Sequence, residues 1–153
     1  MKLLNYLMGA VMAMVMIGCE HPEQESTSKY PPLESIADTR WYSVDTKNQI
    51  YYDIDYATTT GTMVGYNNSL REEEISRREF EYTFTPATER VDALVNVTFD
   101  DGATYGGMVV PKGQFQVNDR DVYWIQLYEV DEKGYIIYDE NGKIKSSILM
   151  WRE

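Results

Sequence analysis

The sequence has little of what most catalytic and metal sites are made of. Its 153 residues include one cysteine, Cys19, and one histidine, His21. One cysteine cannot form an internal disulfide, and one histidine cannot build a histidine-based metal site. The chain also has no Gly-x-Ser-x-Gly elbow and no phosphate-binding glycine loop, so any acid–base chemistry would fall to carboxylates, tyrosines or lysines. We therefore expect a protein that is not an enzyme and that uses no metal or cofactor.

Positive charge is scarce as well. The chain has 14 Lys and Arg residues against 25 Asp and Glu residues, a net charge of -11. Nucleic-acid binding depends on Lys and Arg that displace counterions from phosphates, so this balance argues against a nucleic-acid partner. The length fits one domain and leaves no room for a second catalytic one.

Long hydrophobic runs are missing too. The longest apolar stretch, residues 7–17, is shorter than the about 20 residues that a membrane-spanning helix needs. It follows the basic Lys2 and ends at the small Gly18, which is the pattern of a secretory signal peptide. Residues 1–18 are therefore predicted to be removed, which takes away Lys2 alone among the charged side chains and leaves the mature chain still more acidic.

The residues at the end of this stretch are Met16-Ile17-Gly18-Cys19. They resemble the lipobox of bacterial lipoproteins, with Met16 where that family usually has Leu. The resemblance implies that Cys19 becomes the first residue of the mature chain and carries acyl chains such as palmitate. Several acyl chains would hold a domain firmly to a membrane. The alternative is an ordinary buried thiol.

Residues 19–32 follow as a polar, proline-containing tether that cannot build a core. In the lipoprotein family an Asp after the cysteine is associated with inner-membrane retention. Glu20 at this position therefore favours the outer membrane, on its periplasmic or cell-surface face. His21 lies in the tether, without the rigid surroundings that a general base needs.

Residues 33–153 are dominated by period-two alternation and are predicted to form a single all-β domain. In the clearest case Phe80, Tyr82 and Phe84 share one face of a strand. Turn residues separate the strands, as at Asp101-Gly102. The expected strands cover residues 41–45, 50–56, 62–66, 79–85, 91–99, 104–110, 115–117, 122–130, 134–139 and 144–151.

An antiparallel meander of eight to ten strands leaves two exposed edges unless it closes. We therefore predict an up-and-down β-barrel, with a two-sheet β-sandwich as the alternative. One segment, Ser69 to Arg78, has capping-box spacing and charge pairs four residues apart, which favour a short helix. A bent strand with a loop is the other interpretation of this segment.

The segment Leu33-Glu34-Ser35-Ile36-Ala37-Asp38-Thr39-Arg40-Trp41-Tyr42 resembles the entry to a lipocalin-like barrel, with Thr39 in place of the family's glycine. In that family a helical turn leads into a first strand that carries Gly-x-Trp, and an arginine from the end of the barrel packs over the tryptophan. The resemblance implies that Arg152 packs over Trp41 at the base of the barrel, as a cation–π partner.

Asp53 and Asp55 alternate with Tyr52, Ile54 and Tyr56 in one strand. The two carboxylates share a face and, with Asp45 near, are candidates for glycoside cleavage or calcium binding. We favour the simpler interpretation that this face is a solvated outer wall and that the alternate apolar residues point inward. Neither residue is therefore assigned a metal or a catalytic role.

The strand over residues 122–130 carries Trp124, Gln126 and Tyr128 on one face. Rings offer flat apolar surfaces and an amide fixes orientation, so these three residues are our ligand-binding candidates. Two functions follow, and the first is favoured narrowly. One is a membrane-anchored binding module for a small apolar or glycan ligand held at the open end of the barrel. The other is a structural subunit or inhibitor that docks on an envelope protein.

Overall fold

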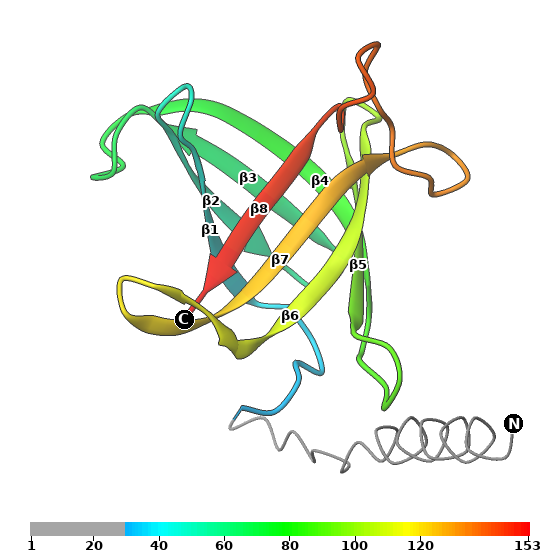
Figure 1. Ribbon diagram of the computed structural model, residues 1–153. Helices are drawn as coiled ribbons and strands as arrows, with labels where there is room; N and C mark the ends of the chain where they lie inside the picture. Colours follow the sequence, from blue (N-terminus) through cyan, green and yellow to red (C-terminus); the bar gives the residue numbers. More distant parts are fainter. Residues whose placement is uncertain (1–29) are drawn as a thin grey trace, which may run out of the picture.

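In the computed structural model, residues 30–153 are described, and every strand in them pairs antiparallel with the next strand along the chain (Figure 1). The predicted signal peptide, Cys19, His21 and the tether up to residue 29 lie outside the described residues. The eight strands are β1 (Thr39–Asp45), β2 (Ile50–Tyr56), β3 (Thr60–Tyr66), β4 (Glu74–Thr85), β5 (Ala93–Phe99), β6 (Thr104–Val117), β7 (Arg120–Val130) and β8 (Ser147–Arg152).

The meander closes into a barrel, as the alternation predicted, and the β-sandwich alternative is not adopted. Closure runs through β1 and β8, which pair at Tyr42 and Trp151. Closure removes the two free edges that an open meander would expose. No helix long and apolar enough to cross a bilayer occurs within residues 30–153.

Side chains from all eight strands fill the interior of the barrel. Trp41, Ile54, Ile125 and Leu127 are almost completely buried. Five aromatic rings extend across the interior in edge-to-face contacts, with centroids 4.9 to 6.4 Å apart, and they belong to Tyr56, Phe80, Tyr82, Phe99 and Tyr105. An eight-stranded barrel is just wide enough for its own side chains to occupy the interior, and here they do.

The segment before β1 closes the lower end of the barrel as drawn in Figure 1. Ile36 is fully buried and Leu33 packs against the same core. The Thr39 hydroxyl donates to the Ile36 carbonyl at 2.5 Å and accepts from the indole N–H of Trp41 at 2.9 Å. The tryptophan that the resemblance singled out is thus a core residue that holds this closing segment in place.

Three local predictions are wrong. The stretch from Ser69 to Arg78 forms no helix, because the chain turns at Arg71 with φ near +57° and enters β4 at Glu74. The alternative, a loop followed by an irregular strand, is what forms. A bulge next to Tyr66 places Glu74 and Arg77 on the same side of β4, where they form an ion pair at 2.8 Å.

The expected hairpin around residues 140–142 does not contribute two barrel strands. Residues 131–146 instead form an excursion held by single bridges, Val130 to Ile136 and Tyr138 to Ile144, and β8 begins at Ser147. The predicted turn at residues 111–113 is also absent, because β6 continues through it with a register shift between Val110 and Phe115.

Candidate binding groove on the outer face

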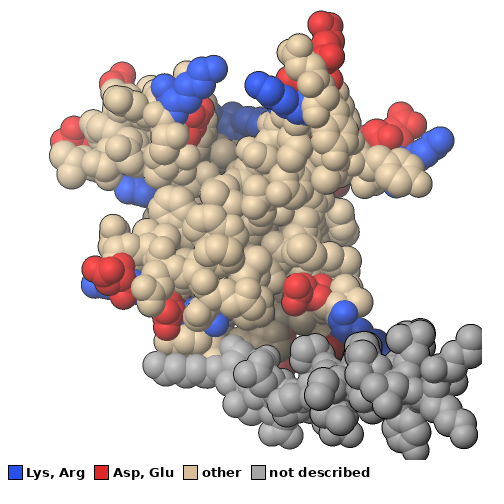
Figure 2. Space-filling view, in the orientation of Figure 1, with Lys and Arg blue, Asp and Glu red and all other residues tan. Residues whose placement is uncertain are grey.

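The outer wall of the barrel has two sides of opposite character. Strands β1 to β4 turn charged residues outward, and these are Arg40, Asp53, Asp55, Glu74, Arg77, Glu79 and Glu81. Opposite them, the outward residues at the centre of the wall from β5 to β8 are uncharged: Leu94, Asn96, Thr98, Thr104, Gly106, Met108, Val110, Trp124, Gln126, Tyr128, Val130, Ser147, Leu149 and Trp151. Figure 2 shows this second side from the front, with charges at its upper and lower rims and a broad uncharged centre.

A groove of about 490 Å³ lies along β6 on this uncharged side. Its floor is at Gly106, which has no side chain, and its walls come from β5, β7 and the excursion after β7. The lining residues include Leu94 and Asn96 on one side, Gln126 and Tyr128 on the other, and Ile136 above. The volume lies within the range of small-ligand sites. All three ligand-binding candidates from the sequence, Trp124, Gln126 and Tyr128, line this groove and not the barrel interior.

Trp124 also belongs to a row of stacked rings at the lower end of the groove. Its ring lies 5.2 Å from that of Phe115 and 6.5 Å from that of Trp151, centroid to centroid, with planes tilted by 22° and 25°. Phe115 belongs to β6 and Trp151 to β8, so the Trp124 indole of β7 is flanked by a ring from each neighbouring strand. We call Phe115, Trp124 and Trp151 the aromatic row.

Arg152 lies at the end of β8, opposite Tyr123 of β7. The cation–π contacts within residues 30–153 include Arg71 over Tyr42, Arg78 over Phe99, and Lys112 over Tyr30 and Tyr123. None of these contacts joins Arg152 to Trp41.

The carboxylates singled out in the sequence have three separate partners. Asp53 is buried, and its Oδ1 accepts from Nε of Arg71 at 2.5 Å. Asp55 binds the guanidinium of Arg40 through both oxygens, at 2.6 and 2.8 Å. Asp45 accepts from the turn that follows β1, and the side-chain amide of Asn48 there lowers its pKa most. Tyr52, Ile54 and Tyr56 point inward, as the alternation predicted.

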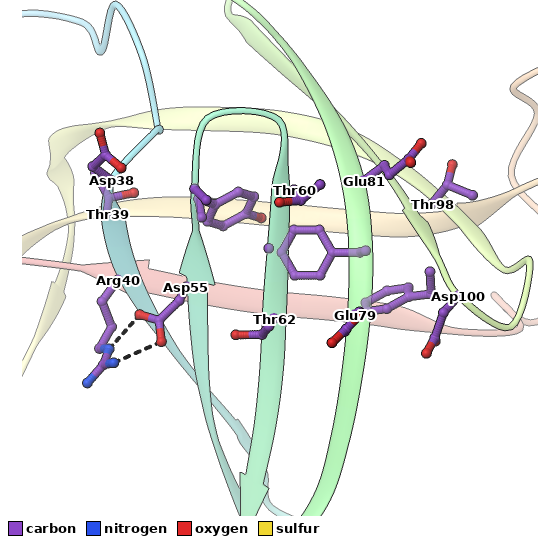
Figure 3. A pocket seen from close by; sticks show the side chains of 15 residues that line it. Asp38, Thr39, Arg40, Asp55, Thr60, Thr62, Glu79, Glu81, Thr98 and Asp100 are labelled. Atoms are coloured by element: carbon purple, nitrogen blue, oxygen red, sulfur yellow. Dashed lines mark hydrogen bonds and ion pairs between the residues drawn. The ribbon is translucent and has the colours of Figure 1, made fainter.

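A second hollow, of about 840 Å³, crosses strands β1 to β5 on the charged side (Figure 3). Carboxylates line it on several strands, and the guanidinium of Arg40 is held there by Asp55. No group of three or more His, Cys, Asp or Glu residues in the described part of the chain is placed to hold a metal ion. This hollow is therefore lined by charged side chains, but the described residues in it form no metal-binding cluster.

The buried tyrosines are poor candidates for proton transfer at neutral pH. Burial raises the pKa of the Tyr56 hydroxyl well above its ordinary value, and this group donates only to the Met150 sulfur at 3.4 Å. Burial also raises the pKa values of Tyr52 and Tyr82. All three hydroxyls therefore stay protonated at neutral pH, and that of Tyr82 donates to the Ala57 carbonyl at 2.6 Å.

Several groove residues were not singled out from the sequence, namely Phe115, Met108, Ile136 and Gly106. One signal for the groove was present: two adjacent glycines inside a predicted strand often mark a close backbone approach. A side chain at Gly107 would place its Cβ within 1.8 Å of the Gln126 carbonyl oxygen, so β6 and β7 approach each other closely there. No sequence signal pointed to Ile136, because its position depends on how the excursion folds back.

Compared with family models, curated proteins and solved structures, the chain has no significant match. The candidate site is therefore defined by this chain's own residues.

Proposed function

We propose that this protein is a lipoprotein anchored through Cys19 to the outer membrane, and that it is a non-enzymatic module that binds a small apolar ligand in the groove along β6. The observation that supports the proposal most is the groove itself, an uncharged hollow of about 490 Å³ on the side of the barrel that carries no charge in its centre. The interior is occupied by the protein's own side chains, so the ligand is assigned to the outer wall.

The geometry favours an apolar ligand over a glycan. Sugar rings bind proteins by stacking on an aromatic face, and the Trp124 ring is already stacked with the rings of Phe115 and Trp151. The most exposed apolar side chains of the groove are Met108, which is 50% exposed, Phe115, which is 44% exposed, and Leu94, which is 36% exposed. The amides of Gln126 and Asn96 are the polar groups that would orient one end of the ligand.

Native mass spectrometry of the full chain, extracted from membranes in mild detergent, tests this function. Met108→Arg places a charge in the groove without disturbing the core, since the Met108 side chain is half exposed. Leu70→Arg is the matched control, because Leu70 is 75% exposed on the connection between β3 and β4. We expect a bound small molecule on the parent chain and on Leu70→Arg, and its loss from Met108→Arg. A parent chain without any adduct, or an adduct retained by Met108→Arg, contradicts the proposal.

A second candidate is an interaction subunit that docks on an envelope protein. The uncharged wall extends beyond the groove, over Leu149 and Trp151, and this breadth favours it. Exposed apolar patches on soluble domains often mark such interfaces. Chemical cross-linking in intact cells tests this second candidate. Docking is supported if the parent chain gives a cross-linked protein band that is lost in Met108→Arg and kept in Leu70→Arg. The absence of such a band contradicts docking.

A further inference from the structure

The aromatic row presents an unusual surface. Phe115 is 44% exposed, and the rings of Trp124 and Trp151 are half-buried beside it. Within residues 30–153 neither of these two indole N–H groups has a hydrogen-bond acceptor, whereas the N–H of the buried Trp41 does. The row thus offers partly exposed apolar rings together with unused donors. Tryptophan takes this role at the border between acyl chains and lipid headgroups, where the ring is buried and the N–H meets an acceptor.

The described chain begins beside this row. The Tyr30 hydroxyl donates to Asp121 at 2.9 Å, and the Tyr30 ring lies against Gly113 and 5.0 Å from Nζ of Lys112. The carbonyl of Pro31 accepts from the Tyr123 hydroxyl at 3.1 Å. These contacts fasten the start of the chain to the β6–β7 hairpin, which also carries Phe115, and Figure 1 shows the chain entering at that end.

The length of the segment before Tyr30 limits how far this end can move from an anchor. Ten residues lie between Cys19 and Tyr30, and the eleven Cα–Cα steps that join them span at most about 40 Å when fully extended and about 18 Å on average for a flexible chain. A lipid on Cys19 would therefore keep the end with the aromatic row close to the bilayer. Tethering of this kind raises the effective concentration of the second binding surface.

The charges around the row are of both signs, with Lys112 and Arg120 beside Asp119, Asp121 and Glu153. Arg120 pairs with Glu153 at 2.9 Å, and Asp121 is engaged by Tyr30 and Gln116. The outward acidic residues of β4 lie on the other side of the barrel wall. A molecule with the aromatic row on the membrane thus points its most acidic wall away from anionic headgroups.

We propose that the aromatic row rests on the bilayer interface, so that Trp124 and Trp151 insert at headgroup depth and fix the orientation of the barrel on the membrane. This inference rests on the proposed anchoring through Cys19. Under it, the lower end of the groove opens at the membrane surface. A protein partner on the same surface is the competing occupant.

Fluorescence quenching tests it with the full lipidated chain in phosphatidylcholine vesicles whose acyl chains carry bromine. The chain's three tryptophans are Trp41, Trp124 and Trp151, and the buried Trp41 serves as an internal reference. We expect strong quenching of the parent chain. The double variant Trp124→Phe with Trp151→Phe keeps aromatic rings in the row and leaves Trp41 as the only emitter, so its emission should be nearly unchanged by bromine.

Flotation of the same vesicles separates the two proposals. A parent chain that floats with the vesicles but is not quenched overturns membrane contact by the row and leaves the anchor intact. Quenching that is equal in the parent and the double variant overturns it as well, since Trp41 alone would then account for it. A parent chain that does not float, like a Cys19→Ala control, overturns the anchor and this inference with it.

Discussion

Replacing Gly61 with alanine tests the close packing inside the barrel. Gly61 of β3 lies opposite Phe80 of β4 with no side chain between them. A Cβ at this position would sit 2.2 Å from Cζ of the Phe80 ring and 2.5 Å from the carbonyl oxygen of Asp55. The ring cannot simply move away, because it is in edge-to-face contact with Tyr56 at 5.2 Å and with Phe99 at 5.5 Å.

Overpacking of a well-packed core costs about 1–3 kcal/mol, and a clash with backbone as well as a ring points to the upper end, about 3 kcal/mol. Urea denaturation followed by tryptophan fluorescence measures the free energy of unfolding. Gly106→Ala is the control, because its Cβ would meet the movable amide of Asn96 at 3.0 Å on the outer wall, and we expect a change within about 0.5 kcal/mol. A Gly61→Ala protein as stable as the parent would refute the filled interior.

Three further variants test individual side chains. Arg71→Ala leaves the buried Asp53 carboxylate without its guanidinium partner, so we expect a loss of about 2 kcal/mol in urea unfolding. Arg77→Ala, whose pair with Glu74 is exposed, should change stability little, and equal effects would contradict the account. Tyr56 has a folded-state pKa raised above the unfolded value of 10.0 by burial, so its stabilising contribution is complete below pH 10 and is lost as pH rises above it. Tyr56→Phe should therefore lose less stability than the parent between pH 8 and 10.5, and parallel losses would show that this hydroxyl is not responsible.

The fold was largely predictable because one physical signal repeats along the chain. Alternation such as Phe80, Tyr82 and Phe84 puts apolar side chains on one face, and the turns keep the strands antiparallel. Closure followed from the need to remove free edges. The segment at Ser69 was misjudged because local charge spacing favoured a helix, whereas the tertiary contact from Arg71 to Asp53 stabilises a turn with positive φ.

The candidate site was predictable only in part. The pattern placed Trp124, Gln126 and Tyr128 on one face of a strand, and they do share a face. Alternation alone cannot say whether such a face lines the interior or the outer wall, since both faces of β7 carry large residues. The orientation of β7 is set by Ile125 and Leu127, which fill the core. The glycine floor of the groove belongs to β6, and its place beside β7 follows from the pairing of the two strands.

Site-specific photo-cross-linking in living cells tests the central claim most directly. A benzophenone amino acid replaces Met108 in the groove, or Glu81 on the charged wall as the control. Intact-mass analysis after irradiation reads the adduct. The account predicts a small-molecule adduct of one defined mass at position 108 and none at position 81. No adduct at position 108, or the same adduct at both positions, contradicts it.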